Sequence, residues 1–140
     1  MAVRTVTLTI QMAGGTQIEN VTKSVAAAVA KAKLHAGIVT VFVKHTTASV
    51  MIIEDEAGIR ADTHTFWDRL IPADPRWRHN TVNPGEDNGH SHLRGQLQGP
   101  SVTIPFTAGS LLLGTWQQVV LVDFDTRART RELVLQVLGE

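Results

Sequence analysis

With 140 residues, 43% of them apolar and 19% charged, the chain has the size and composition of one globular domain. Its thirteen basic and thirteen acidic residues balance, which argues against nucleic acid as a partner, because phosphate binding usually needs a basic excess. The absence of cysteine excludes disulfides and thiolate chemistry, so any metal would need His, Asp or Glu ligands. No apolar run is long enough for a signal peptide or a membrane span, and we expect a cytoplasmic location without membrane association.

The N-terminal third predicts two strands followed by a helix. Apolar and polar residues alternate over 1–11, and Gly14-Gly15 then separates this segment from a short strand at 16–21, which predicts an opening β-hairpin. Thr22 is expected to be the N-cap of a helix that ends near Leu34.

A second pair of strands and a second helix are expected next. Residues 38–43 are nearly all apolar, which predicts a strand covered on both faces, and a shorter strand follows at 50–53. The acidic trio 54–56 favours the start of a helix, which should end before Pro72 and bury one apolar side, from Ile59 to Leu70. The trio could instead bind Mg²⁺ with a phosphate substrate, but a favourable interaction of the carboxylates with the positive end of the helix dipole is the favoured interpretation.

The second half of the chain predicts a long loop and then mostly strands. Residues 73–91 lack periodicity, and a loop of this length is usually functional or disordered. A short helix near 91–97 precedes four expected strands of an antiparallel meander: 101–106, 110–113, 117–123 and 130–138. We therefore predict one α+β domain over residues 1–140, a mixed or antiparallel β-sandwich with helices packed on one side. The last strand is too apolar to have a face in water, so helices or another subunit should cover it, and we favour an oligomer.

The segment 83–92 concentrates hydrogen-bonding side chains, including two histidines and two carboxylates. If this segment is extended, His90 and His92 point to the same side and can bind a metal or an anionic substrate. On a helix the same spacing would separate them. Alternatively, Asp87 and Asn88 serve only in turns and in capping the helix that follows.

His45 and His79 are two further candidates. With His92 they provide three imidazoles, which can hold zinc and leave a fourth position open for catalysis. For His45 alone, a hydrogen bond at a strand end is the simpler interpretation. Three hydroxyls follow His45, those of Thr46, Thr47 and Ser49. They are expected to hydrogen-bond to an anion or to the turn and not to act as nucleophiles, since no nucleophile-elbow sequence is present.

A third candidate feature lies near the start of the strand at 117–123. Gly114 interrupts the strand pattern, and Trp116 stands beside the carboxamide of Gln117. This pair could stack on a heteroaromatic ring and hydrogen-bond to it, or it could fill the core.

Together these segments resemble the YjbQ family, also called the UPF0047 family, over nearly the whole chain. The resemblance depends on ordered blocks of sequence at compatible spacing: 44–49, Glu54, His79, 85–92, 99–105, 114–117 and 136–140.

The resemblance implies an α+β sandwich that forms a homotrimer and has a weak thiamine-phosphate-synthase activity. In that reaction a pyrimidine diphosphate alkylates a thiazole phosphate and releases pyrophosphate. The family pattern transfers to six residues: His45, His79, Asn88, His92, Trp116 and Gln117. Asp87 and His90 transfer less dependably.

In this interpretation the three imidazoles are catalytic, binding a metal or the leaving diphosphate, while Trp116 stacks on the pyrimidine. The side-chain amides of Asn88 and Gln117 hydrogen-bond to ring nitrogens, and the hydroxyls after His45 contact the substrate. Mg²⁺ would need carboxylates, for which Glu54, Glu86 and Asp87 are the candidates. Two alternatives remain: a zinc-dependent hydrolase or other three-histidine metal enzyme, and a non-catalytic trimeric module that binds a small anion.

Overall fold

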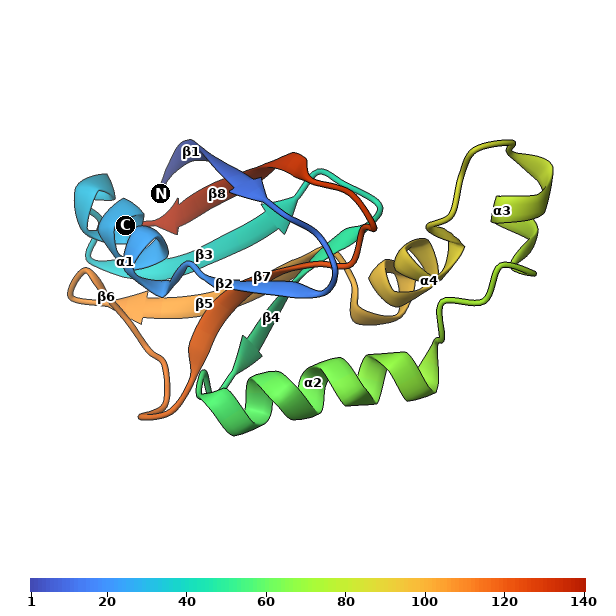
Figure 1. Ribbon diagram of the computed structural model, residues 1–140. Helices are drawn as coiled ribbons and strands as arrows, with labels where there is room; N and C mark the ends of the chain where they lie inside the picture. The colour runs from blue at the N-terminus through green and yellow to red at the C-terminus, as the bar shows by residue number, and fades with distance from the viewer.

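The computed structural model describes all 140 residues, arranged as two β-sheets with helices at both ends and along one side (Figure 1). The strands are β1 (Ala2–Met12), β2 (Gln17–Asn20), β3 (Ala36–Val43), β4 (Ala48–Ile53), β5 (Ser101–Thr107), β6 (Ser110–Leu111), β7 (Gln118–Asp123) and β8 (Arg129–Gly139). The helices are α1 (Thr22–Ala32), α2 (Ala57–Leu70), α3 (Arg78–Val82) and α4 (Gly89–Gln98). None of them is long and apolar enough to cross a membrane.

Every strand pairing is antiparallel. One sheet has the order β1-β8-β3-β5-β6 and the other the order β2-β7-β4. The predicted α+β class is confirmed, as is the arrangement of antiparallel sheets with a few helices.

Two hydrophobic cores hold these layers together. The larger core lies between the sheets and contains buried side chains of both, such as Val41 and Leu121, together with Val25 of α1. The smaller core lies on the other face of the three-stranded sheet, where Trp67 of α2 packs edge to face on Phe124 with ring centroids 4.9 Å apart. Burial on both faces explains why β7 is apolar from Val119 to Val122.

The predicted opening hairpin is wrong, and the predicted closing meander is correct only for the pairing of β5 with β6. β1 pairs with β8 and β2 with β7, so the first two strands lie in different sheets, and so do β7 and β8. Between β1 and β2 the chain crosses from one sheet to the other through a left-handed turn at 14–16. A Cβ on Gly14 would lie 2.5 Å from the Asp125 carbonyl oxygen, so this crossing needs glycine.

Three local expectations also need correction. β3 is covered on one face only: Val39 is fully buried, whereas Ile38 and Phe42 on the other face are each 40% exposed. Thr22 is the first residue of α1 and not its N-cap, because its hydroxyl bonds with the backbone of β7. The segment 73–91 is not one loop, since α3 and the start of α4 lie within it.

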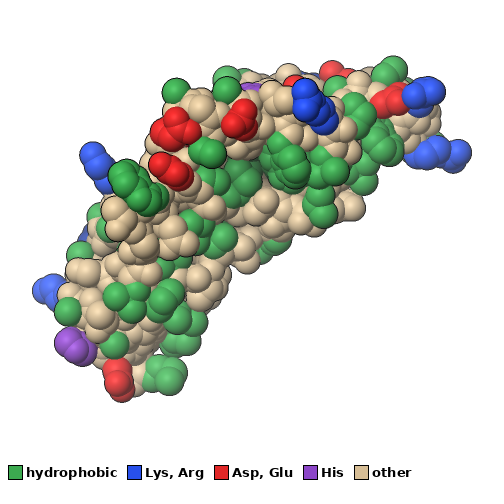
Figure 2. All heavy atoms as spheres, turned by 90° about the horizontal axis from the view of Figure 1, so that it is seen from below, with side chains coloured by type: hydrophobic (Ala, Val, Ile, Leu, Met, Phe, Trp, Pro, Cys, Tyr) green, Lys and Arg blue, Asp and Glu red, His purple; other side chains and the backbone are tan.

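Helix α2 begins and ends as expected but is less buried than its pattern indicates. The carboxylate of Glu56 caps it by accepting from the amides of Gly58 and Ile59. Of its apolar side only Trp67 is buried, and Phe66 and Leu70 remain about half exposed. Seen from below Figure 1, the molecule is elongated and bent, with apolar groups between charged side chains (Figure 2).

Candidate functional site

A polar cavity of about 590 Å³ lies where the β3–β4 turn, α3, α4 and the β7–β8 turn meet. Twelve residues line it and none is hydrophobic: Lys44, His45, Thr46, Thr47, His79, Glu86, Asn88, His92, Asp125, Arg129, Thr130 and Arg131. Seven of the candidate residues named from the sequence thus share one cavity, although up to 47 positions separate them along the chain, from His45 to His92. Such a surface suits a small polar or charged ligand.

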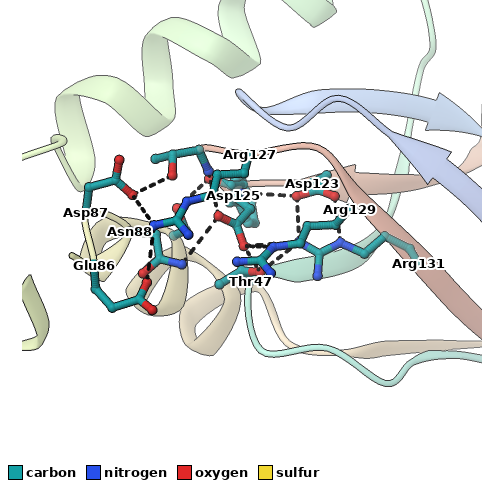
Figure 3. A network of polar contacts seen from close by, with 12 residues as sticks. Thr47, Glu86, Asp87, Asn88, Asp123, Asp125, Arg127, Arg129 and Arg131 are labelled. Atoms are coloured by element: carbon teal, nitrogen blue, oxygen red, sulfur yellow. Dashed lines mark hydrogen bonds and ion pairs between the residues drawn. The ribbon is translucent and has the colours of Figure 1, made fainter. Parts of the chain in front are cut away.

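A buried ion pair at the start of β8 forms the base of this cavity (Figure 3). The Arg131 guanidinium donates to both carboxylate oxygens of Asp123, over 2.6 and 2.7 Å, and its Nη2 also donates to the Thr47 hydroxyl over 2.7 Å. Asp123, Arg131 and Thr47 are all at least 96% buried. The two-pronged pairing satisfies both charges and fixes the β3–β4 turn to β8.

Asp125 joins this base to the helical side of the cavity. Its Oδ2 accepts from Thr47 over 2.9 Å and from Arg129 over 3.1 Å, and its Oδ1 accepts from Asn88 over 3.3 Å. Burial raises the pKa of Asp125, but the hydrogen bonds from Thr47, the Thr126 amide and Asn88 outweigh burial and hold this pKa below its ordinary value. The carboxylate is therefore charged at neutral pH and committed to protein donors.

The three cavity histidines are arranged as a pair and a single ring. The rings of His79 on α3 and His92 on α4 are 4.4 Å apart between centroids. His45 stands apart from the pair, and its Nε2 accepts from the Glu132 amide over 3.1 Å. A neutral His45 ring must then carry its proton on Nδ1, which has no protein partner and is a donor for a ligand.

Burial favours neutral imidazoles in this cavity. It lowers the pKa of His45, and the nearby Arg131 lowers this pKa further. It also lowers the pKa of His92, where His79 adds to the effect. Both rings are therefore neutral hydrogen-bonding groups at pH 7 and not fixed cations.

Two buried polar atoms in the cavity lack a protein partner. They are Nε2 of His79 and Oδ1 of Asn88. The orientation of the Asn88 amide follows from Asp125, because only its Nδ2 can donate to that carboxylate. Its Oδ1 is therefore an acceptor, only 3% of the residue is exposed, and a donor from a ligand or a water molecule would satisfy it.

Five of the eight predicted substrate-binding residues lie outside the cavity lining, and three of these are His90, Ser49 and Asp87. The segment of His90 and His92 is helical, so of the two alternatives the helical one, in which the spacing separates the rings, holds, and His90 is buried, 6% exposed. The Ser49 hydroxyl is fully buried and faces the Gly95 carbonyl oxygen at 3.5 Å. Asp87 lies beside the cavity and accepts from the Thr126 hydroxyl over 2.6 Å.

Trp116 and Gln117 lie at the opposite end of β7 from the cavity. The β6–β7 connection and the α3–α4 region are at opposite ends of Figure 1, and six strand residues span roughly 20 Å. The Gln117 side chain accepts from the Gly114 amide over 2.8 Å, and Trp116 is 70% exposed. Within one chain, therefore, these two side chains do not share a pocket with the histidines.

The donor set does not fit the expected three-histidine zinc site. No group of three or more His, Asp or Glu side chains is arranged to hold a metal ion. His45 cannot serve as a ligand in its present hydrogen bond, because Nε2 is occupied and Nδ1 carries the proton. Glu86 is the cavity carboxylate without a committed hydrogen bond, since its nearest cation, Arg127, is 3.8 Å away.

Sequence reasoning assigned no site role to the charged residues beneath and around the histidines. These are Lys44, Asp123, Asp125, Arg129 and Arg131. A signal was present: carboxylates at the end of an apolar strand, 123 and 125, precede arginines at 129 and 131, where β8 alternates its faces. Buried charges are usually paired, so opposite charges on these two consecutive segments are candidates for an ion pair.

Fold and cavity together define a two-sheet α+β protein with a polar, histidine-lined pocket. A family model described as UPF0047 protein YjbQ-like matches residues 6–140, and the chain therefore belongs to this family, as the resemblance implied.

Relatives of this chain span nearly its whole length. A UPF0047 protein of Methanothermobacter thermautotrophicus is 30% identical over 140 residues, covering 100% of this chain and 95% of the relative. A UPF0047 protein of Synechocystis sp. is 37% identical over 128 residues, covering 90% of this chain and 86% of the relative. Among solved structures, a hypothetical protein of Aeropyrum pernix has a TM-score of 0.89 and 34% identity, covering 98% of this chain and 99% of that one. A YbjQ-like protein of unknown function from Sulfolobus solfataricus has a TM-score of 0.88 and 28% identity, covering 99% of this chain and 100% of that one.

Proposed function

We propose that the polar cavity binds a small phosphorylated substrate and supports the weak thiamine-phosphate-synthase reaction that the family resemblance implies. The observation that carries this proposal is the meeting of His45, His79, Asn88 and His92 in a cavity with no hydrophobic lining. Both substrates of that reaction are small phosphate esters. Lys44 and Arg129 add positive charge at the same cavity.

The residues of the cavity suit the departure of pyrophosphate. When the thiazole nitrogen attacks the pyrimidine methylene carbon, the carbon–oxygen bond to the diphosphate breaks and its electrons leave with pyrophosphate. No proton needs to move, so the enzyme's task is to stabilise negative charge on the leaving oxygens. The Nδ1–H of His45 is a donor for that charge, and the Arg129 guanidinium lies in the same lining.

Mg²⁺ would add charge stabilisation if it entered with the diphosphate, since this ion is usually bound by one or two carboxylates and by substrate phosphates. Glu86 would hold it, because the oxygens of Asp125 already accept hydrogen bonds from the protein. The zinc hydrolase alternative receives no such support from the donor set.

The direct experiment is a synthase assay with pyrimidine diphosphate and thiazole phosphate, run on the wild type and on His45→Gln. We expect the variant to lose roughly 10- to 100-fold in rate, the effect of a hydrogen bond to a charged group, about 1.5–3 kcal/mol. His64→Gln, on the exposed side of α2, is the matched control and should keep the wild-type rate. Equal rates in all three proteins would contradict the proposal. Binding of pyrophosphate without turnover would favour the non-catalytic anion-binding module.

We also propose the homotrimer that the resemblance implies. Its support here is the uncovered face of the five-stranded sheet, where strand pairing aligns one apolar row across four strands: Val3, Leu138, Ile38 and Pro105. Ile38 is 40% exposed and Val3 is 48% exposed, so a second copy could bury both. Sedimentation of the wild type should give a trimer and Ile38→Lys a smaller species. A monomeric wild type would contradict this assembly.

A further inference from the structure

A second cavity of about 490 Å³ adjoins the polar one. The two share four lining residues, Lys44, His45, Thr46 and His92. The rest of the second lining is largely apolar and comes from the end of β3, the start of β4, α4 and the residue before β5: Phe42, Val43, Ala48, Gly95, Gln96 and Pro100. No carboxylate lines this second cavity.

The second cavity depends on a close approach of α4 to the β3–β4 turn. A Cβ on Gly95 would lie 2.6 Å from the Thr46 carbonyl oxygen, closer than real Cβ atoms come to backbone. Glycine at this position therefore allows the helix to lie against the turn. Phe42 on the opposite side is 40% exposed, and its free ring surface is available to a ligand.

We infer that the two cavities form one composite site for an anionic compound that also carries a flat unsaturated ring, with the anion in the polar cavity and the ring against Phe42 and Pro100. The inference rests on the proposed function and adds to it a subsite for the ring of the substrate, the second cavity. Its basis is the contrast between the linings: the first has no hydrophobic residue, whereas the second has apolar walls and no acid.

The residues shared by the two cavities suit such a ligand. The His45 and His92 rings line both cavities, so they would lie where the ring joins its charged group. An aromatic contact with Phe42 contributes about 0.5–1.5 kcal/mol beyond burial of area, and the Gln96 carboxamide can hydrogen-bond to a ring nitrogen.

The test compares two probes, inorganic phosphate and phenyl phosphate, by calorimetry on the wild type, Phe42→Ala and Phe66→Ala. Wild type should bind phenyl phosphate several-fold more tightly than phosphate. Phe42→Ala should reduce this preference by roughly 3- to 10-fold, the effect of one aromatic contact, and leave phosphate affinity unchanged. Phe66, on α2 and 54% exposed, is the matched control and its variant should keep the preference.

A second variant keeps the test decisive if Phe42→Ala does not fold. Gln96 is exposed, and Gln96→Trp should fill the apolar cavity and exclude the phenyl group while phosphate still binds. If phosphate binds and phenyl phosphate binds no more tightly, or if the preference survives both variants, the composite site is wrong and the proposed function stands. If neither probe binds to the wild type, the proposed function fails and this inference fails with it.

Discussion

The substitution Arg131→Met tests whether the buried ion pair holds the base of the cavity in place. The change removes the only cation that pairs with Asp123, whose carboxylate is fully buried, and removes one donor to Thr47. An uncompensated buried charge costs about 3–5 kcal/mol. Against a total stability of roughly 5–15 kcal/mol, this is a loss of a fifth or more.

Chemical denaturation at pH 7 measures this loss directly. The double variant Asp123→Leu with Arg131→Met should be more stable than Arg131→Met alone, since removing both charges leaves neither unpaired. Arg76→Met is the matched control: Arg76 pairs with Asp74 in solvent, and its loss should leave the unfolding midpoint unchanged. A free energy of unfolding for Arg131→Met within about 1 kcal/mol of wild type would refute the reasoning, because a buried unpaired carboxylate cannot cost so little.

Three further predictions concern individual side chains in the cavities and on the surface. Because the pKa values of His45 and His92 are lowered in the folded state, the unfolded chain binds more protons below about pH 6.5, so stability should fall from pH 7 to pH 5. His45→Gln with His92→Gln should flatten that slope in denaturation curves. Gly95→Ala should cost about 1–3 kcal/mol, since its Cβ would collide with the Thr46 carbonyl, and an unchanged melting temperature would contradict the close approach. Trp116→Ala should leave the stability unchanged, because its side chain is largely exposed, and a drop of several degrees in melting temperature would show that it packs.

The sequence predicted element types better than their partners. The alternation in β1 correctly marks a strand with one apolar face, but alternation says nothing about which strand lies beside it. The pairing of β1 with β8 joins residues more than a hundred positions apart, and the turn at Gly14 and Gly15 changes sheet instead of reversing the strand. Local turn patterns favoured a hairpin, because they describe only adjacent segments of the chain and say nothing about a second sheet.

The candidate site was predictable for the residues whose chemistry is visible in isolation. His45, His79 and His92 stood out because histidine-rich polar segments interrupt an otherwise apolar pattern, and all three line one cavity. Arg131 and Asp123 could not be recognised in this way, because a charged residue within a strand is expected to face solvent unless its burial and its partner are known. Helix α4 was expected to begin later, so the directions of His90 and His92 could not be foreseen.

The most direct test of the account is a histidine-resolved NMR titration with pyrophosphate at pH 7. The chain has six histidines, which report on different parts of the molecule. The ring signals of His45, His79 and His92 should shift together and saturate with a single affinity, while those of His35 and His64, which are exposed elsewhere, stay unchanged. No shift at the three cavity rings, or equal shifts at all exposed rings, would contradict a specific anion site in the polar cavity.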